Sequence, residues 1–259
     1  MPRKDLNERL LNAKTSKETK LLIEAGADVN AKRNYSGTVY CGWTALMLAR
    51  TAEETKLLIE AGADVNVKGN DGWTALMSAQ TTGQTKLLIE AGADVNAKNN
   101  DGNTALMLAR TVEQTKLLIE AGADVNAKDN EGWTALMWAG GFARANLAEQ
   151  IKLLIEAGAD VNAKNNDGNT ALMLAQTVEK TKLLIEAGAD VNAKDNEGDT
   201  ALMWAAYKGR AEAVAILIEA GADINIKDNH GNTALMLGVR KGQTEAVAIL
   251  IEAAAEDRA

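Results

Sequence analysis

Residues 99–132 read NNDGNTALMLARTVEQTKLLIEAGADVNAKDNEG, and residues 165–198 repeat this string with two changes, Arg110/Gln176 and Gln114/Lys180. Its segment Thr-Ala-Leu-Met occurs seven times, starting at Thr44, Thr74, Thr104, Thr134, Thr170, Thr200 and Thr233. The steps between these threonines are 30, 30, 30, 36, 30 and 33 residues. Recurrence at such a period is the signature of a tandem array of small structural units. The whole chain is therefore predicted to be one repeat array.

Each unit is predicted to form two short helices and a loop. The first helix is the apolar run 104–110, and the second runs through 116–121 after a cap at Thr111. Thr111 precedes Gln114 by the spacing of a capping box, and the same two positions hold Thr51/Glu54, Thr81/Gln84 and Thr177/Lys180. Gly122 and its counterparts can take the left-handed conformation that ends a helix. Because one unit cannot bury its apolar face alone, stability must come from stacking of neighbouring units.

These motifs resemble those of the ankyrin-repeat family. Asp-Gly-x-Thr-Ala-Leu-Met is similar to the family's opening Gly-x-Thr-Pro-Leu-His, and Leu-Leu-Ile-Glu-Ala-Gly-Ala-Asp-Val-Asn is similar to its second helix and loop. The likeness covers essentially the whole chain. It implies an all-α solenoid of stacked helix pairs with hairpin-like loops, eight helix pairs including the terminal caps. It also implies a single domain over 1–259, with an N-terminal cap at about 5–30, internal repeats at about 31–225 and a C-terminal capping repeat at about 226–256.

The chain departs from the family pattern in two ways. Alanine and methionine replace the family's proline and histidine throughout, so hydrogen bonds centred on that histidine must be absent or replaced. Most units have 30 residues where the family usually has 33, and the missing three fall between the helices. Thr104 to Gly122 spans 19 residues, whereas Thr200 to Gly221 spans 22. We therefore expect shortened helices in the 30-residue units.

The composition excludes several classes of function. The 259 residues include 36 acidic and 28 basic ones, a formal net charge of −8, which argues against non-specific binding of nucleic acid. The single Cys41 rules out an internal disulfide framework and fits a reducing compartment. No apolar run approaches the roughly 18 residues of a membrane span, and the N-terminus lacks the apolar core of a signal peptide. We expect a soluble, cytoplasmic protein that contacts neither nucleic acid nor membrane.

No arrangement typical of catalysis, a metal site or a cofactor site stands out. The sole histidine, His230, takes a loop position that holds Asp or Glu in other units, which favours an ordinary surface side chain. Asp28 and Asn30 superficially resemble calcium ligands, but the EF-hand spacing with its terminal glutamate is missing. No glycine-rich phosphate-binding motif follows a strand. We therefore expect no enzyme activity, no metal and no cofactor.

The resemblance implies a concave groove, formed by the loops and first helices, in which family members hold other proteins. The residue before each repeat threonine generally faces that groove, and here these residues are Trp43, Trp73, Asn103, Trp133, Asn169, Asp199 and Asn232. A tryptophan there has no packing role implied by the repeat, since sister units have Asn or Asp. Buried aromatic rings dominate many interfaces, so we predict that this row contacts a partner protein.

Two insertions add candidate contacts. The first loop is six residues longer than the others, and its alternating residues suit a hairpin that presents Tyr35 and Tyr40 to a partner. The alternative is that these two rings pack on each other and hold the loop in shape. The second insertion lies between the helices of the 36-residue unit. It is either a simple length variant or a second contact site that uses Phe142 and Arg144.

The sequence therefore predicts a non-catalytic scaffold whose groove and extended first loop recognise one partner protein. By analogy, we expect that a stand-alone acidic array acts by blocking its target, as an inhibitor or immunity-type protein does. The net charge of −8 favours a basic partner, through encounter rate more than affinity. The alternative is a structural protein whose near-identical repeats self-associate through the aromatic patch. The first interpretation expects a monomer when the chain is free.

Overall fold

The computed structural model describes residues 3–34, 40–141 and 147–256. Within these ranges the chain forms fifteen helices and no strand, which confirms the predicted all-α repeat fold. Contacts divide the chain into two compact units, Met1–Asn130 and Glu131–Ala259. Each unit is a stack of repeats with its own core. A single domain that includes both units stays a prediction.

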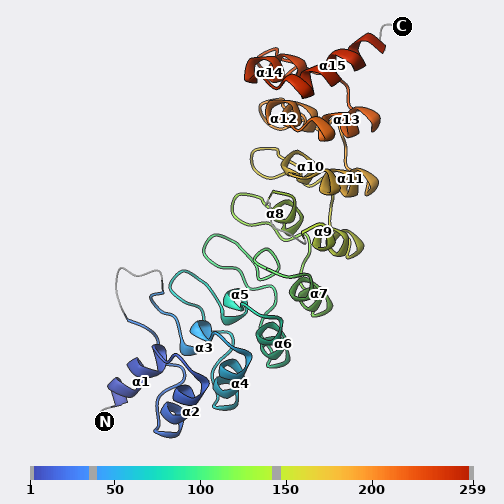
Figure 1. The fold of residues 1–259 in the computed structure, drawn as a ribbon. Helices are drawn as coiled ribbons and strands as arrows, with labels where there is room; N and C mark the ends of the chain where they lie inside the picture. Colours follow the sequence, from blue (N-terminus) through green and yellow to red (C-terminus); the bar gives the residue numbers. More distant parts are fainter. Residues whose placement is uncertain (1–2, 35–39, 142–146, 257–259) are drawn as a thin grey trace. The chain divides into compact units, whose positions relative to one another are not determined.

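The first unit arranges its helices in two layers (Figure 1). Its helices are α1 (Arg3–Leu11), α2 (Ser16–Glu24), α3 (Ala45–Leu48), α4 (Ala52–Glu60), α5 (Ala75–Ser78), α6 (Thr82–Glu90) and α7 (Val112–Glu120). The first helices α1, α3 and α5 contact one another in sequence order. The second helices follow the same order, α2 against α4, α4 against α6 and α6 against α7. Each repeat therefore packs on the next through both of its layers.

The second unit repeats this arrangement, with first helices of seven or eight residues in three of its repeats. Its helices are α8 (Ala135–Gly141), α9 (Leu147–Glu156), α10 (Ala171–Leu174), α11 (Val178–Glu186), α12 (Ala201–Tyr207), α13 (Ala211–Glu219), α14 (Ala234–Lys241) and α15 (Thr244–Glu256). First helices α8, α10, α12 and α14 pack in order, and so do second helices α9, α11, α13 and α15. The same two-layer stack thus accommodates units of 30, 33 and 36 residues.

The same few positions form the core of every internal repeat. In the repeat of α3 and α4, Leu46 and Met47 are 3% exposed and Leu58 is 2% exposed. Their counterparts in the other internal repeats are buried as well. Full burial of one Leu or Met side chain contributes roughly 1.5–3 kcal/mol. The repeated Thr-Ala-Leu-Met and Leu-Leu-Ile-Glu segments therefore supply core side chains to the internal repeats.

The expected shortening of helices is confirmed, and it falls on the first helix. Helices α3, α5 and α10 have four residues each, whereas α8 and α12 have seven and α14 has eight. The second helices α4, α6, α7, α11 and α13 all have nine. The three missing residues of a 30-residue unit are therefore the last turn of the first helix.

The first helix predicted at 104–110 is not formed. Residues 105–108 are a turn. In α5 the backbone N–H of Ser78 donates to the Thr74 carbonyl at 3.2 Å, and the equivalent bond from Leu108 to Thr104 is not formed. A four-residue helix depends on very few four-residue-spaced bonds, so a small change in one bond converts it to a tighter turn. The described residues thus hold seven helix pairs, with α7 preceded by a turn, instead of the eight pairs expected.

The predicted caps are confirmed. The side chains of Thr51, Thr81 and Thr111 each accept a hydrogen bond from the backbone N–H three residues on, and Thr81 forms the complete capping box with Gln84. Gly122 has φ of 87°, in the left-handed region, and its counterparts after the other second helices behave alike. Local sequence therefore sets where these capped second helices begin and end.

Hydrogen bonds between successive loops complete each stack. In the first unit the backbone N–H of Asn100 donates to the Asp71 carbonyl at 3.0 Å, and that of Asn130 donates to the Asp101 carbonyl at 2.9 Å. A Cβ placed at Gly102, where φ is +82°, would lie 2.7 Å from the Asn130 nitrogen. Glycine at this position permits the close approach of the two loops.

Candidate functional site

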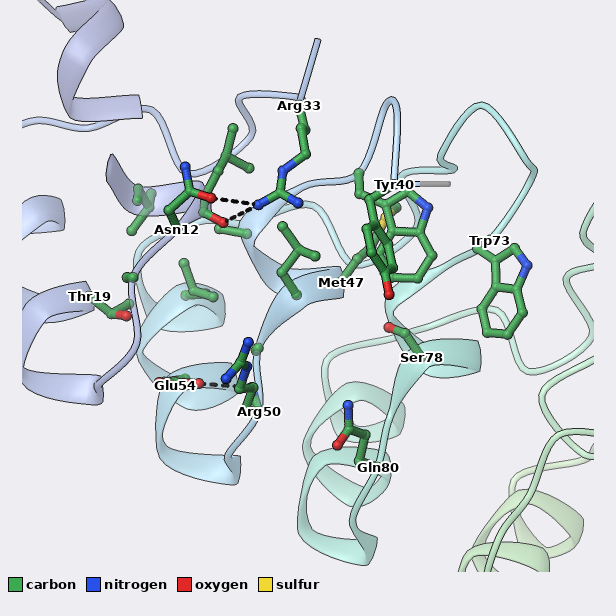
Figure 2. Close-up of a pocket in the computed structure, with 18 of the residues that line it drawn as sticks. Asn12, Thr19, Arg33, Tyr40, Met47, Arg50, Glu54, Trp73, Ser78 and Gln80 are labelled. Atoms are coloured by element: carbon green, nitrogen blue, oxygen red, sulfur yellow. Dashed lines mark hydrogen bonds between the residues drawn. The ribbon is translucent and has the colours of Figure 1, made fainter. Parts of the chain in front are cut away.

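An open groove lies in the first unit, between the loops that precede α3 and α5 and the ends of those helices. Its volume is about 790 Å³. Figure 2 shows Tyr40 and Trp73 on its loop side and Arg50 and Gln80 near the helix ends. Its aromatic lining residues are Tyr40, Trp43 and Trp73, and its basic lining residues are Lys14, Arg33, Arg50 and Arg110.

The three rings form one cluster. The ring of Trp43 lies 4.9 Å from that of Tyr40 in an edge-on arrangement at 76°, and 5.9 Å from that of Trp73. Trp43 is only 8% exposed, and its Nε1–H donates to both carboxylate oxygens of Asp71 at 3.1 and 3.2 Å. The assumption that this tryptophan has no packing role is therefore wrong. Trp43 supports the cluster, while Tyr40, at 44% exposure, and Trp73, partly exposed, present ring surface to the groove.

A glycine in the next loop makes room for the Trp43 ring. A Cβ at Gly69 would lie 2.7 Å from Trp43 Cδ1 and 2.7 Å from an Asp71 oxygen. The equivalent loop position holds Asn99 in the following repeat. Glycine thus replaces a polar residue in the loop that follows Trp43. This replacement is the sequence signal that could have indicated burial of the Trp43 ring.

The basic side chains follow the first helices in successive repeats. The position directly before the capping threonine is occupied in turn by Lys14, Arg50, Gln80 and Arg110. These four residues are exposed. Within the described parts of the chain, the side chains of Lys14, Arg50 and Arg110 make no ion pair. Arg33 differs, because its guanidinium donates to the Leu11 carbonyl at 2.9 Å, at the end of α1.

A row of buried polar side chains, which the capping interpretation missed, links neighbouring repeats. Gln84 Nε2 donates to the Ala49 carbonyl at 2.9 Å, and Gln114 Nε2 donates to the Ala79 carbonyl at 3.3 Å. Each carbonyl belongs to the C-cap residue directly after the first helix of the preceding repeat. The carbonyls at the end of a helix have no partner within that helix. The capping-box glutamines therefore also provide hydrogen bonds to such carbonyls in the preceding repeat.

Lys180 fills this role in the second unit. It is 2% exposed, and its Nζ donates to the carbonyls of Ala139 at 2.8 Å and Gly140 at 3.4 Å, at the carboxyl end of α8. A cation is stabilised at that end of a helix by the aligned peptide dipoles. Burial lowers the pKa of Lys180 from its usual value. The change Gln114/Lys180 in the repeated string thus matches the longer first helix before it.

The predicted loop residues of the second unit are all partly exposed: Trp133, Asn169, Asp199 and Asn232. Asn103 in the first unit is also partly exposed. The ring of Trp133 lies 5.6 Å from that of Trp138. Tyr35, Phe142 and Arg144 lie outside the described residues, so their predicted contacts, and the alternative in which Tyr35 packs on Tyr40, stay predictions. The structure brings together Tyr40, Trp43 and Trp73 in one site.

The helix-pair stack and its loop-side groove are the features of a known repeat family. The family model described as ankyrin repeats, in three copies, matches residues 11–99, 84–142, 111–195, 140–228 and 176–258. This chain belongs to the ankyrin-repeat family. No individual curated protein matches it. Ankyrin repeats generally mediate contacts between proteins, and ankyrin-repeat proteins are typically non-catalytic scaffolds.

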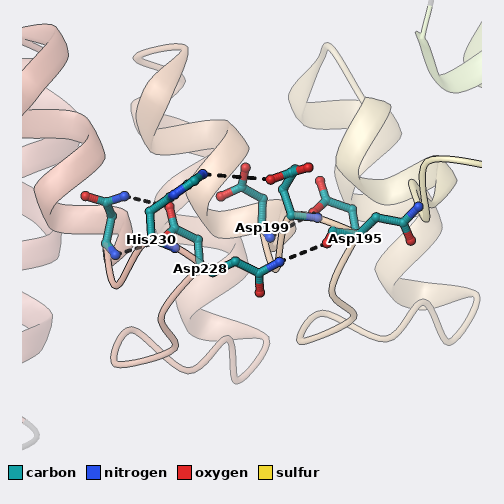
Figure 3. Close-up of polar contacts among 8 residues, drawn as sticks. Asp195, Asp199, Asp228 and His230 are labelled. Carbon is teal, nitrogen blue, oxygen red and sulfur yellow. Dashed lines mark hydrogen bonds and ion pairs between the residues drawn. The ribbon is translucent and has the colours of Figure 1, made fainter.

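A carboxylate-rich loop cluster distinguishes the second unit of this ankyrin-repeat chain (Figure 3). Burial, together with the nearby charges of Asp195, Asp228 and Glu197, raises the pKa of Asp199 to about 6, and His230 partly opposes this. Asp195 Oδ1 accepts the backbone N–H of Asp199 at 2.8 Å. The Oδ1 atom of Asp199 is buried and has no hydrogen-bond partner.

In the next loop an amide, instead of a carboxylate, occupies the position of Asp199. Asn232, in the position of Asp199, donates its Nδ2–H to Asp228 Oδ2 at 2.8 Å. Burial alone would raise the pKa of Asp228, but this bond and the backbone N–H groups of Asn232 and His230 lower it overall. His230 itself is exposed, as predicted, and lies 3.8 Å from Glu197. An amide at this loop position therefore donates to the neighbouring carboxylate, whereas Asp199 places a second carboxylate beside Asp195.

Neither unit shows a further site of the kinds considered from sequence. Among the described residues no group of three or more His, Cys, Asp or Glu side chains could hold a metal ion. In the same ranges no helix has the length and apolar character to cross a membrane. The groove of the first unit is therefore the candidate functional site.

Proposed function

We propose that this ankyrin-repeat chain is a non-catalytic scaffold that binds one partner protein in the groove of its first unit. The observation that carries the proposal is the aromatic cluster. Tyr40 and Trp73 expose ring surface, while Trp43 beneath them is buried and fixed by Asp71. Rings held in place before binding lose little conformational freedom on contact, which is why such anchors dominate interface energies.

The test compares capture of partners by three forms of the protein. The wild-type chain, the variant Tyr40→Ala/Trp73→Ala and the control Glu60→Ala/Glu90→Ala are immobilised and exposed to native extract. Glu60 and Glu90 lie in exposed ion pairs on second helices, away from the groove. A partner retained by wild type and control but lost from the ring variant is expected. Retention by the ring variant, with unchanged circular dichroism, would show that the groove is not the site.

We also propose that binding inhibits the partner, as an inhibitor or immunity-type protein does, and that the scaffold works as a cytoplasmic monomer. The acidic net charge supports a partner that is basic overall, since it speeds encounter. If the captured partner is an enzyme or a toxin, stoichiometric addition of the chain should abolish its activity. Undiminished activity in the saturated complex would remove the inhibitory role and leave the scaffold role in place.

Self-association is the second candidate function. It is favoured by apolar side chains on the last repeat, where Met236 and Val239 of α14 and Ile251 of α15 are each more than half exposed. Light scattering over a concentration series separates the two functions. A constant monomer mass removes this candidate, and a mass that rises with concentration and falls in Met236→Ser/Val239→Ser supports it.

A further inference from the structure

We infer that the groove of the first unit holds an extended acidic segment of its partner, with carboxylates on Arg50 and Arg110 and apolar side chains against Tyr40 and Trp73. This inference rests on the proposed function and specifies the chemistry of the bound segment. The bound segment is acidic even though the proposed partner is basic overall. The partner would therefore present a local acidic stretch to this groove.

The charge inside the groove is opposite to that of the whole chain. The exposed side chains of Lys14, Arg50 and Arg110 make no ion pair within the described residues. Two of the three acidic lining residues keep their charge but are held by hydrogen bonds to neighbouring groups of the protein. Glu54 is buried and accepts the backbone N–H of Arg50 at 2.8 Å, and Asp71 accepts the Trp43 ring N–H. Lys14, Arg33, Arg50 and Arg110 line the groove together with the three carboxylates of Glu54, Asp71 and Asp101, so four basic minus three acidic residues give the lining a formal charge of +1 in a chain of net charge −8.

The two arginines are suited to carboxylates. A guanidinium forms paired, parallel hydrogen bonds with a carboxylate, and such charge-assisted bonds are stronger than neutral ones. The aromatic cluster that lines the same groove supplies apolar surface. A peptide with alternating acidic and apolar side chains would contact both the arginines and the aromatic rings.

The spacing of the arginines favours an extended segment. Arg50 and Arg110 take the same place two repeats apart, with Gln80 between them. Packed helices lie about 8–10 Å apart, so the two guanidinium groups start from backbone positions separated by about 16–20 Å. An extended chain rises about 3.3 Å per residue and alternates its side chains between two faces. About six residues would connect the arginines, with alternate side chains facing the helix ends and the rings.

A nucleic acid fits the groove less well than an acidic peptide. Asp101 lies at the rim with its side chain exposed, and Asp71 lies beside the rings. A continuous row of phosphates would meet these carboxylates and the net charge of −8, whereas binding of nucleic acid usually needs clustered basic residues. A peptide can place its few carboxylates on the arginines alone.

The experiment measures binding of three labelled probes by fluorescence anisotropy. The probes are a peptide of alternating glutamate and leucine, its counterpart of alternating lysine and leucine, and a single-stranded oligodeoxynucleotide of the same length. They are titrated with wild type, with Arg50→Glu/Arg110→Glu and with the control Lys56→Glu/Lys86→Glu. The control makes the same change of net charge on exposed lysines of α4 and α6. Circular dichroism confirms that all three forms are folded.

The expected result is that the glutamate peptide binds wild type and control alike, and that the arginine variant weakens it by about tenfold or more. Gln80→Arg, which completes the basic row, should tighten it several-fold. Equal binding of the glutamate and lysine peptides, binding of the oligonucleotide alone, or no loss in the arginine variant would each overturn the inference. A captured partner that needs Tyr40 and Trp73 but not Arg50 and Arg110 would overturn it while leaving the proposed function intact.

Discussion

The loop position before the repeat threonine has opposite chemistry in two loops, one from each unit. In the first unit it holds Trp43, whose ring N–H satisfies the Asp71 carboxylate. In the second unit it holds Asp199, which adds a carboxylate beside Asp195 and Asp228. The backbone hydrogen bonds between successive loops are alike in both units. The repeat backbone therefore fixes where this side chain lies. The residue type at this position then decides whether the loop gains a hydrogen bond to a carboxylate or a repulsive contact between carboxylates.

The comparison is tested most strongly by Trp43→Ala. Because the ring is buried and contacts both Tyr40 and Trp73, its removal should lower the free energy of unfolding by about 3–5 kcal/mol. Trp73→Ala, which removes a partly exposed ring, should cost clearly less. Urea denaturation followed by circular dichroism measures both. Equal costs for the two variants would mean that Trp43 has no special supporting role.

Replacement of Lys180 by methionine should have the next largest effect. The change keeps the length of the side chain but leaves the Ala139 and Gly140 carbonyls without this donor, at a cost of about 1–3 kcal/mol in the free energy of unfolding. The same denaturation experiment applies. The matched control is Lys182→Met on the exposed face of α11, which should change stability little. Similar behaviour of both variants would contradict the capping role of Lys180.

Gly69→Ala tests the fit of the Trp43 ring. In the wild-type background the added Cβ collides with the ring and with Asp71, so the variant should lose about 1–2 kcal/mol of stability. In the Trp43→Ala background most of that cost should disappear, since the space is then free. A double-mutant cycle measures the coupling. Additive effects of the two changes would show that Gly69 does not serve the ring.

Asp199→Asn should give the smallest effect and one that depends on pH. The folded-state pKa of Asp199, about 6, lies above its usual value of 3.8, so the folded state binds the proton more tightly. Wild-type stability should therefore fall as pH rises from about 4 to about 6, by about 1 kcal/mol because the site is partly exposed.

In Asp199→Asn this fall should be absent, since the amide resembles Asn232 and carries no charge. Denaturation midpoints measured over that pH range provide the check, with Asp124→Asn, at an exposed loop position, as control. An unchanged pH profile in Asp199→Asn would mean that the cluster does not destabilise the ionised loop.

Local chemistry made the repeats, caps and helix ends predictable. Thr81 with Gln84 and the left-handed Gly122 act within a few residues, so their spacing is enough to indicate their role. Core positions were predictable for the same reason, because period and apolarity coincide. The turn at 105–108 was not, since a one-turn helix and a turn differ by a single hydrogen bond.

The candidate site was predictable only in part. The sequence indicated the loop row and its aromatic residues, but it placed Trp43 among free contact residues and left the basic row unnoticed. Trp43 is buried because Gly69 and Asp71 of the following loop receive its ring. Those contacts depend on how the two loops stack, which residue spacing within one repeat does not encode.

The sequence by itself determined the family and the caps and glycine ends of most second helices, because these follow from short-range spacing repeated many times. Only the tertiary structure decided which side chains serve the fold and which remain available. Burial and hydrogen bonding between repeats removed Trp43, Glu54 and Lys180 from the surface and left Tyr40, Trp73 and the arginines exposed. The physical reason is that the solvent exposure of a side chain depends on which residues of the adjacent repeats pack against it, and these contacts form only when the repeats stack.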